Sequence, residues 1–224
     1  MKRIAFPFLC GLLLAVPAQA VVIAAWDFQT NTPAELANSA TSPVVLANTG
    51  SGSLQGVHAS ADSDWTTPAG NGSSESLSGN TWATGDYWEI SFPTGGVSTL
   101  FLTFDAAGSN TGPRDFDIYT STDGTTFAQS PHSYSLILSN WSAVTPHPEH
   151  TRTFDLASVY TPYDGTFYLR FVVNGTASIN GGTIAAGGTS RLDNIIISDT
   201  APVPEPGSAV LGLLGLAGLV RRRR

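Results

Sequence analysis

The sequence predicts an all-β fold, a single β-sandwich or jelly roll of roughly nine strands that spans residues 21–199. Three observations lead to this prediction. Ser, Thr, Gly and Asn cluster at turns between short β-branched and aromatic runs. Several runs alternate apolar and polar residues, as strands with one buried face do. No helical periodicity lasts more than a turn or two, and the segment is long enough to bury the core of one domain.

The predicted strands are the nine runs in which β-branched and aromatic residues dominate. They cover residues 22–28, 44–47, 87–92, 100–105, 116–121, 134–138, 151–156, 167–174 and 191–198. In the eighth run, every second residue from Phe167 to Val173 is apolar, and we expect this face to be buried. The last run is apolar on both faces around Asn194, which indicates a central strand beside the first.

Residues 48–86 are mostly small and polar. A stretch of this composition and length predicts a long decorated loop region with one strand at most.

Residues 1–20 have the three parts of a secretory signal peptide. Lys2 and Arg3 form a basic start, residues 4–16 are apolar, and small residues at 18 and 20 suit a cleavage site. Cys10, the one cysteine of the sequence, lies inside this segment. The sequence therefore predicts an exported protein whose mature form has no cysteine.

The C-terminal residues also have three parts. Residues 200–206 form a proline-rich linker, since proline fixes φ and lacks an N–H. Residues 207–220 are uncharged and predict a helix that enters a membrane, although at about 1.5 Å per residue it spans roughly 21 Å of a roughly 30 Å hydrocarbon core. The arginines 221–224 favour a cytoplasmic end.

The order of Pro204, Glu205 and Pro206, a short apolar helix and an arginine run resembles the PEP-CTERM sorting signal of Gram-negative bacteria. The arginines of this run are Arg221, Arg222, Arg223 and Arg224. The resemblance implies recognition by an exosortase, a membrane cysteine transpeptidase that removes the helix. It also implies transient anchoring in the inner membrane, followed by delivery to the cell surface or an exopolysaccharide matrix. The alternative is a plain anchor behind a proline-rich linker.

The charge of residues 21–199 is strongly negative. These residues contain four arginines, no lysine and sixteen acidic residues, which give a formal charge of −12. Nucleic acid is therefore excluded as a partner, because phosphate binding requires a basic surface. Cations and neutral sugars remain open as ligands.

Five tryptophans in an exported domain suggest sugar binding, because pyranose rings stack on flat aromatic faces. Trp26 and Trp88 share strand faces with apolar residues and are predicted to lie in the core. Trp65, Trp82 and Trp141 lie among polar residues. These three are candidates for a ligand platform, and burial is the alternative.

Residues 112–124 place Asp115, Asp117 and Tyr119 on one strand face. Together with residues 191–195, this segment resembles a strand and hairpin common in secreted carbohydrate-binding jelly rolls.

In such modules an acidic residue of the last strand often helps to hold a structural Ca²⁺ with residues near the N-terminus. The resemblance thus points to Asp193 and Asp27, whose oxygen atoms suit calcium. The alternative is that Asp193 pairs with an arginine such as Arg191 or Arg170.

Signatures of enzymes are absent from the sequence: there is no G-x-S-x-G, H-E-x-x-H or P-loop motif, and no catalytic cysteine. His147, Glu149 and His150 bring two imidazoles and a carboxylate together in a proline-containing loop. Zinc would require a further ligand, and His132 is the nearest candidate. A glycosidase requires two facing carboxylates, which the sequence does not locate.

The sequence therefore predicts a non-catalytic surface or matrix protein that an exosortase processes and that associates with exopolysaccharide or another glycan. Two alternatives are a secreted glycan-active enzyme on a jelly-roll scaffold and a purely structural biofilm component.

Overall fold

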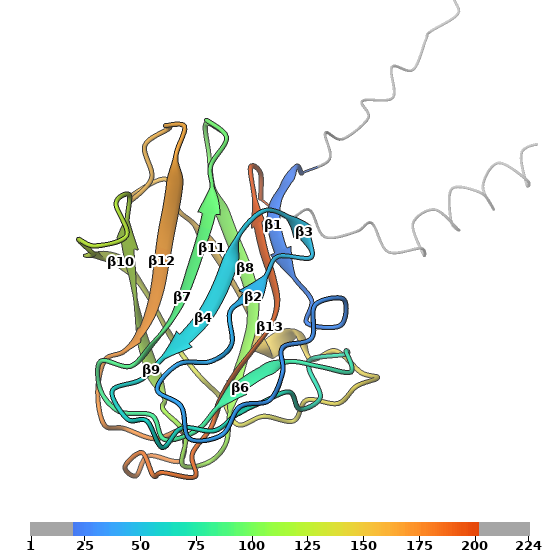
Figure 1. Ribbon diagram of the computed structural model, residues 1–224, viewed down its shortest axis with the longest axis vertical. Coiled ribbons are helices and arrows are strands. Elements are labelled where there is room, and N and C mark those ends of the chain that lie inside the picture. The colour runs from blue at the N-terminus through green and yellow to red at the C-terminus, as the bar shows by residue number, and fades with distance from the viewer. Residues whose placement is uncertain (1–19, 202–224) are drawn as a thin grey trace, which may run out of the picture.

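The computed structural model describes residues 20–201, which form two antiparallel sheets packed face to face (Figure 1). The predicted sorting helix, the arginine tail and all but the last residue of the predicted signal peptide lie outside this range. Between residues 20 and 201, no helix is long and apolar enough to cross a membrane. The predicted β-sandwich is confirmed, although its strands number more than nine.

The larger sheet, called sheet A, runs in the order β11-β8-β13-β1-β3, with β6 also pairing β13 and β5 pairing β6. Its strands are β1 (Val22–Trp26), β3 (Thr49–Gly50), β5 (Trp65–Thr66), β6 (Leu77–Gly79), β8 (Phe101–Gly108), β11 (Thr151–Asp155) and β13 (Ser190–Ser198).

The other sheet, called sheet B, runs in the order β10-β9-β12-β7-β4-β2. Its strands are β2 (Val45–Leu46), β4 (Ser53–Val57), β7 (Tyr87–Pro93), β9 (Asp115–Ser121), β10 (Ala128–Ser135) and β12 (Thr166–Val173). A turn of 3-10 helix, η1 (Pro148–His150), precedes β11.

The core lies between the sheets and is built by period-2 alternation. In β12, the predicted face from Phe167 to Val173 is buried, and the residues between are half-buried on the outer face. Phe171 of sheet B stacks on Phe104 of sheet A with ring centroids 4.7 Å apart. Burying each such side chain stabilises the fold by about 1.5–3 kcal/mol. Trp26 and Trp88 are also in the core, as predicted.

The last strand is central, as its two apolar faces predict. β13 lies between β8 and β1, with Trp26 opposite Ile195. Its pairing with β8 shifts register between Asp193 and Ile196, where Asn194 adopts a left-handed conformation with φ 48°. This bulge lies beside a buried polar network formed by Asp193, Asn71 and Asp105.

The prediction of a long loop for residues 48–86 is wrong, because four short strands, β3 to β6, form there. The small residues that suggested a loop instead allow close packing around Trp65. A Cβ at Gly56 would lie 2.2 Å from the Trp65 ring, and a Cβ at Gly79 would lie 2.6 Å from it. Glycine is required at both positions by the approach of an indole ring.

β10 begins six residues before the predicted strand at 134–138. Its sequence is mostly polar, since it is an edge strand with few buried side chains. Pro131 interrupts the ladder, and the pairing with β9 shifts register between Gln129 and Ser133. Proline is tolerated in sheets at such edge positions.

The two ends of the domain lie side by side on neighbouring strands of sheet A. The Val21 amide donates to Asp199 Oδ1 at 2.9 Å, and the Asp199 amide donates to the Val21 carbonyl at 3.2 Å. β1 and β13 therefore enter and leave the sandwich at one end (Figure 1).

Candidate functional site

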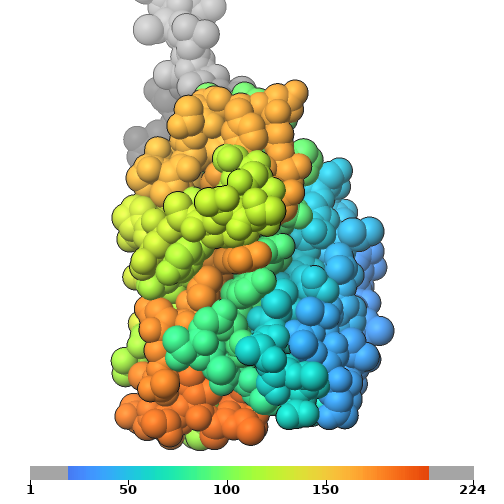
Figure 2. Space-filling view, turned by 60° about the vertical axis from the view of Figure 1, so that its left-hand side comes forward, coloured from blue at the N-terminus to red at the C-terminus, as the bar shows by residue number. Residues whose placement is uncertain are grey.

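The outer face of sheet B carries a continuous row of polar and aromatic side chains. The strand registers place Tyr119 opposite Gln129, Arg170 opposite Tyr119, Glu89 opposite Arg170, and Gln55 opposite Glu89. These five residues are half-buried or exposed, and each lies on a different strand. We call them the sheet B row. Figure 2 looks onto this face, where yellow-green β10 and β9 are followed by orange β12 and green β7.

Arg170 is held rigidly at the centre of the row. Its Nε donates to Glu89 Oε2 at 2.7 Å, and both side chains are about one quarter exposed. Its guanidinium carbon lies 3.6 Å from the ring centroid of Phe127 and 4.2 Å from that of Tyr87. A planar cation packed against two aromatic rings is pre-organised, so binding through it would cost little side-chain freedom.

The carboxylates around the row are already paired or hydrogen-bonded. Asp117 accepts hydrogen bonds from the side chains of Gln129 at 2.9 Å and Asn174 at 3.0 Å. Arg114 pairs with Asp115 at 2.8 Å, and the hydrogen bond from its guanidinium holds the pKa of that carboxyl below its usual range. Arginines pair with Asp115 and Glu89, whereas Asp117 keeps its negative charge. The planar polar side chains of the row suit a ligand with many hydroxyl groups.

The structure places Trp65 and Trp82 inside the domain rather than on a ligand platform. They are 1% and 4% exposed, and their indole N–H groups donate to the carbonyls of Ser39 and Gly79. Both rings also contact the imidazole of His58. Trp65 lies on the two-residue strand β5 and Trp82 in the segment after β6, so the polar residues next to them in the sequence concealed this burial.

Trp141 is half-buried in the segment between β10 and β11. Its ring packs edge-on against His150, with centroids 5.7 Å apart. Part of the indole remains at the surface, and Trp141 is not a member of the sheet B row.

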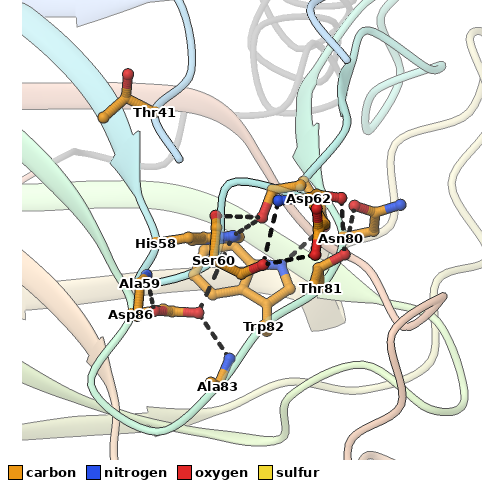
Figure 3. A network of polar contacts seen from close by, with 12 residues as sticks. Thr41, His58, Ala59, Ser60, Asp62, Asn80, Thr81, Trp82, Ala83 and Asp86 are labelled. Carbon is orange, nitrogen blue, oxygen red and sulfur yellow. Dashed lines mark hydrogen bonds and ion pairs between the residues drawn. The ribbon is translucent and has the colours of Figure 1, made fainter. Parts of the chain in front are cut away.

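Ser63, His58 and Asp86 meet near the buried tryptophans, and Figure 3 labels His58 and Asp86 beside Trp82. His58 Nδ1 lies 2.6 Å from Ser63 Oγ and 4.0 Å from Asp86 Oδ2. A nucleophilic triad uses one imidazole nitrogen for the serine and the other for the carboxylate. Here both partners approach Nδ1, and Ser63 is fully buried. The arrangement lacks the geometry of a triad.

This cluster instead holds the loop after β4 in place. Asp86 accepts the amide N–H groups of Ala59 and Ala83, each at 2.7 Å. Burial lowers the pKa of His58 to about 4, so the imidazole is neutral at neutral pH. Its Nε2 is buried without a hydrogen-bond partner in the part of the chain that the structure describes.

Asp193 is fully buried on sheet A and is satisfied by nearby protein donors. Oδ2 accepts from Ser73 Oγ at 2.6 Å and from the Asn71 amide at 2.8 Å, and Oδ1 accepts from the Asn194 amide at 2.8 Å. Burial raises the pKa of Asp193 to about 6, although these hydrogen bonds act in the opposite direction. Asp105 lies close by, since Asn71 Nδ2 and Asn194 Nδ2 both donate to its Oδ2.

The structure does not bring Asp27 and Asp193 together through any hydrogen bond among residues 20–201. Asp27 instead caps the turn after β1, where Oδ1 accepts the amides of Gln29 and Thr30 at 3.1 Å. Nor does an arginine satisfy Asp193: Arg170 pairs with Glu89 on the other sheet. The oxygens of both candidate calcium ligands thus accept hydrogen bonds from the protein itself, and a shared calcium ion stays a prediction.

Across the described range, no three His, Asp or Glu side chains gather closely enough to hold a metal ion. His132 does not join the loop of His147 and His150, since it contacts Phe154 and Ser158 instead.

Strand alternation could identify single members of the sheet B row, because it places Tyr119 and Arg170 on outer faces. Strand alternation could not show that these residues lie next to one another, because the pattern of one strand does not determine its register with its neighbours. Sequence reasoning therefore missed the row.

Several solved structures resemble the domain at low identity. The K1 and K3 cleaved adhesin domains of Lys-gingipain from Porphyromonas gingivalis W83 are 12% and 14% identical, with TM-scores of 0.45 and 0.42. These matches cover 82% and 79% of this chain and 100% and 98% of those domains. The xylan-binding domain CBM22-2 of Xyn10C from Paenibacillus barcinonensis is 14% identical, with a TM-score of 0.44 over 80% of this chain and 99% of that domain. At this level of similarity, neither ligand nor activity transfers to the chain.

No curated protein sequence matches the chain. Residues 202–224, in contrast, match the PEP-CTERM protein-sorting motif. This range includes the Pro204–Pro206 triplet and the four arginines on which the sequence prediction depended. The chain therefore carries a PEP-CTERM protein-sorting motif directly behind an all-β sandwich domain.

Proposed function

We propose that the chain is an exported surface or matrix protein that an exosortase processes at its tail, and whose domain binds a neutral glycan along the sheet B row. The sorting motif supports export and surface sorting. The row, with Arg170 clamped at its centre, is the observation that carries the proposed ligand.

The row has the chemistry that a neutral glycan requires. Sugars offer hydroxyl groups to planar polar side chains and apolar ring faces to aromatic ones. Tyr119 supplies an aromatic group, Gln55 and Gln129 supply amides, and the Arg170–Glu89 pair supplies donors and acceptors without net charge. Five strands at a spacing of about 4.8 Å make the row about 19 Å long, enough for several sugar units.

Export to an exopolysaccharide matrix would bring such a surface to its ligand. Residues 21–199 contain no cysteine, so the domain has no thiol that an oxidising environment outside the cell could modify. The glycan is therefore proposed to be a component of the matrix into which the sorting signal directs the protein.

A glycan array probed with the full chain in mild detergent tests the proposal. We expect binding to neutral oligosaccharides that falls at least tenfold in Tyr119→Ala and in Gln55→Ala, since both remove contacts at partly exposed positions. Trp141→Ala is the matched control, because it removes another partly exposed aromatic side chain that lies outside the row.

Each other outcome contradicts part of the proposal. Loss of binding in Trp141→Ala alone would move the site to the segment before β11. Absence of binding to any glycan would favour a purely structural matrix component. Release of reducing sugar by the wild-type chain would favour a glycan-active enzyme.

A further inference from the structure

Three polar atoms in the segment between β10 and β11 form a nearly equilateral triangle. His147 Nδ1 lies 3.2 Å from Glu149 Oε1. The Asn140 side-chain atom assigned as Nδ2 lies 3.1 Å from His147 Nδ1 and 3.3 Å from Glu149 Oε1. His147 and Glu149 belong to the histidine-containing loop for which the sequence offered no further zinc ligand nearby except His132. Asn140 lies seven residues before His147 in the sequence.

The size of this triangle is that of one face of a metal coordination tetrahedron. Ligand atoms about 2.0–2.1 Å from a tetrahedral zinc ion are about 3.3 Å from one another. An ion above the triangle would therefore meet all three atoms at coordination distance without movement of the backbone.

We propose that Asn140, His147 and Glu149 bind a divalent transition-metal ion of the zinc class, with a fourth position open to water. The ligands are His147 Nδ1, Glu149 Oε1 and Asn140 Oδ1. The imidazole and the carboxylate are ordinary ligands of such ions, and an amide oxygen completes the face. The three residues include only two His, Asp or Glu side chains, so the site agrees with the lack of any group of three in the described residues.

Asn140 needs only to exchange the ends of its amide group. Oδ1 and Nδ2 of an asparagine occupy nearly the same space, so the choice between them depends on hydrogen bonding and not on packing. In the present assignment, Oδ1 lies 2.5 Å from His150 Nε2. After the exchange, Nδ2 donates to that nitrogen, so His150 keeps a hydrogen bond to Asn140.

His147 is pre-positioned by the buried polar network of sheet A. Its amide donates to Asn71 Oδ1 at 2.7 Å, and its carbonyl accepts from Asn71 Nδ2 at 3.0 Å. Asn71 is 4% exposed and is held in turn by Asp193 and Asp105. Such outer contacts orient ligands and sustain metal affinity.

The site is also open to an ion from solution. The side chains of His147 and Glu149 are 28% and 48% exposed. Pro148 begins the 3-10 turn that brings Glu149 back over His147. With three protein ligands, the site resembles an open metal centre more than a closed structural one.

Titration calorimetry of the full chain with ZnCl₂ tests the proposal. We expect one saturable site per chain, with affinity reduced at least tenfold in His147→Ala and in Glu149→Gln. His132→Ala is the matched control, since it removes a histidine on β10 whose ring contacts Phe154 and not this segment. It should bind zinc as the wild type does.

A gain-of-affinity variant keeps the test decisive if the substitutions above disturb folding. Asn140→Asp supplies a charged oxygen at the third corner of the triangle, and we expect it to tighten zinc binding at least tenfold. Co²⁺ should in addition give the intense visible absorption of a tetrahedral site in the wild type and not in His147→Ala. No saturable binding, equal loss in His132→Ala, or no gain in Asn140→Asp would overturn the assignment.

Discussion

His58 shows how burial decides what one side chain does. Its imidazole contacts the rings of Trp65 and Trp82 and lies 4.0 Å from Asp86, yet its pKa is lowered to about 4 from 6.5 because it is buried. The carboxylate of Asp86 is itself occupied by backbone amides. The tryptophan environment therefore determines the charge state of His58.

The pH dependence of stability should report on this residue. Between pH 6.5 and about 4 the unfolded chain binds a proton at His58 that the folded chain does not, so stability falls as the pH falls through this window. The difference between the two pKa values corresponds to about 3 kcal/mol. Urea unfolding at pH 7 and pH 4 should therefore show a weaker pH dependence in His58→Gln than in the wild type.

The wild type must be compared with His58→Gln because Asp193 changes the pH dependence of stability in the opposite direction. Its folded pKa of about 6 lies above the ordinary value of 3.8, so its contribution to stability is lost as the pH rises through 6. Equal pH dependence in the wild type and in His58→Gln would contradict the assignment to His58.

Asp193 also decides whether calcium stabilises the domain. Its oxygens already accept hydrogen bonds from Ser73, Asn71 and Asn194, so we expect millimolar calcium and chelator to leave the melting temperature unchanged. Asp193→Asn should destabilise the domain by about 1.5–3 kcal/mol, because buried donors lose a charged acceptor. Stabilisation by calcium that disappears in Asp193→Asn would instead establish the calcium site that the resemblance implied.

At the scale of elements, the short strands β4 and β6 depend on glycine at their contacts with Trp65. A Cβ at Gly56 would lie 2.2 Å from a buried indole ring that has no room to move. We expect Gly56→Ala to destabilise the domain by about 1–3 kcal/mol through overpacking.

Gly187→Ala is the control for this prediction, because a Cβ there meets nothing within 4 Å. Chemical denaturation of both variants provides the measurement. A Gly56→Ala midpoint equal to that of Gly187→Ala would show that Trp65 is less tightly held than the structure indicates.

For the whole molecule, the two ends leave from adjacent strands, and the sorting motif follows the last strand after only a few residues. If an exosortase processes the chain, mature protein from the native host should lack residues 207–224. Intact-mass analysis of surface protein provides the measurement. A mass that retains these residues would favour a plain anchor.

The elements that sequence reasoning found are those whose signal is local. Alternation in β12 and the two apolar faces of β13 follow from the neighbours of each residue along one strand, and both predictions are confirmed. The sorting motif is likewise a continuous stretch, which made it recognisable without a structure.

The sites depend instead on residues that only the folded chain brings together. Trp65 is buried because glycines of two other strands make space for its ring, and Gln55 joins Arg170 in one row because β4, β7 and β12 pair in one register. Asn140 meets His147 and Glu149 because Asn71, from a distant loop, holds the His147 backbone. Such contacts cross between strands and loops, where no periodicity along the chain can encode them.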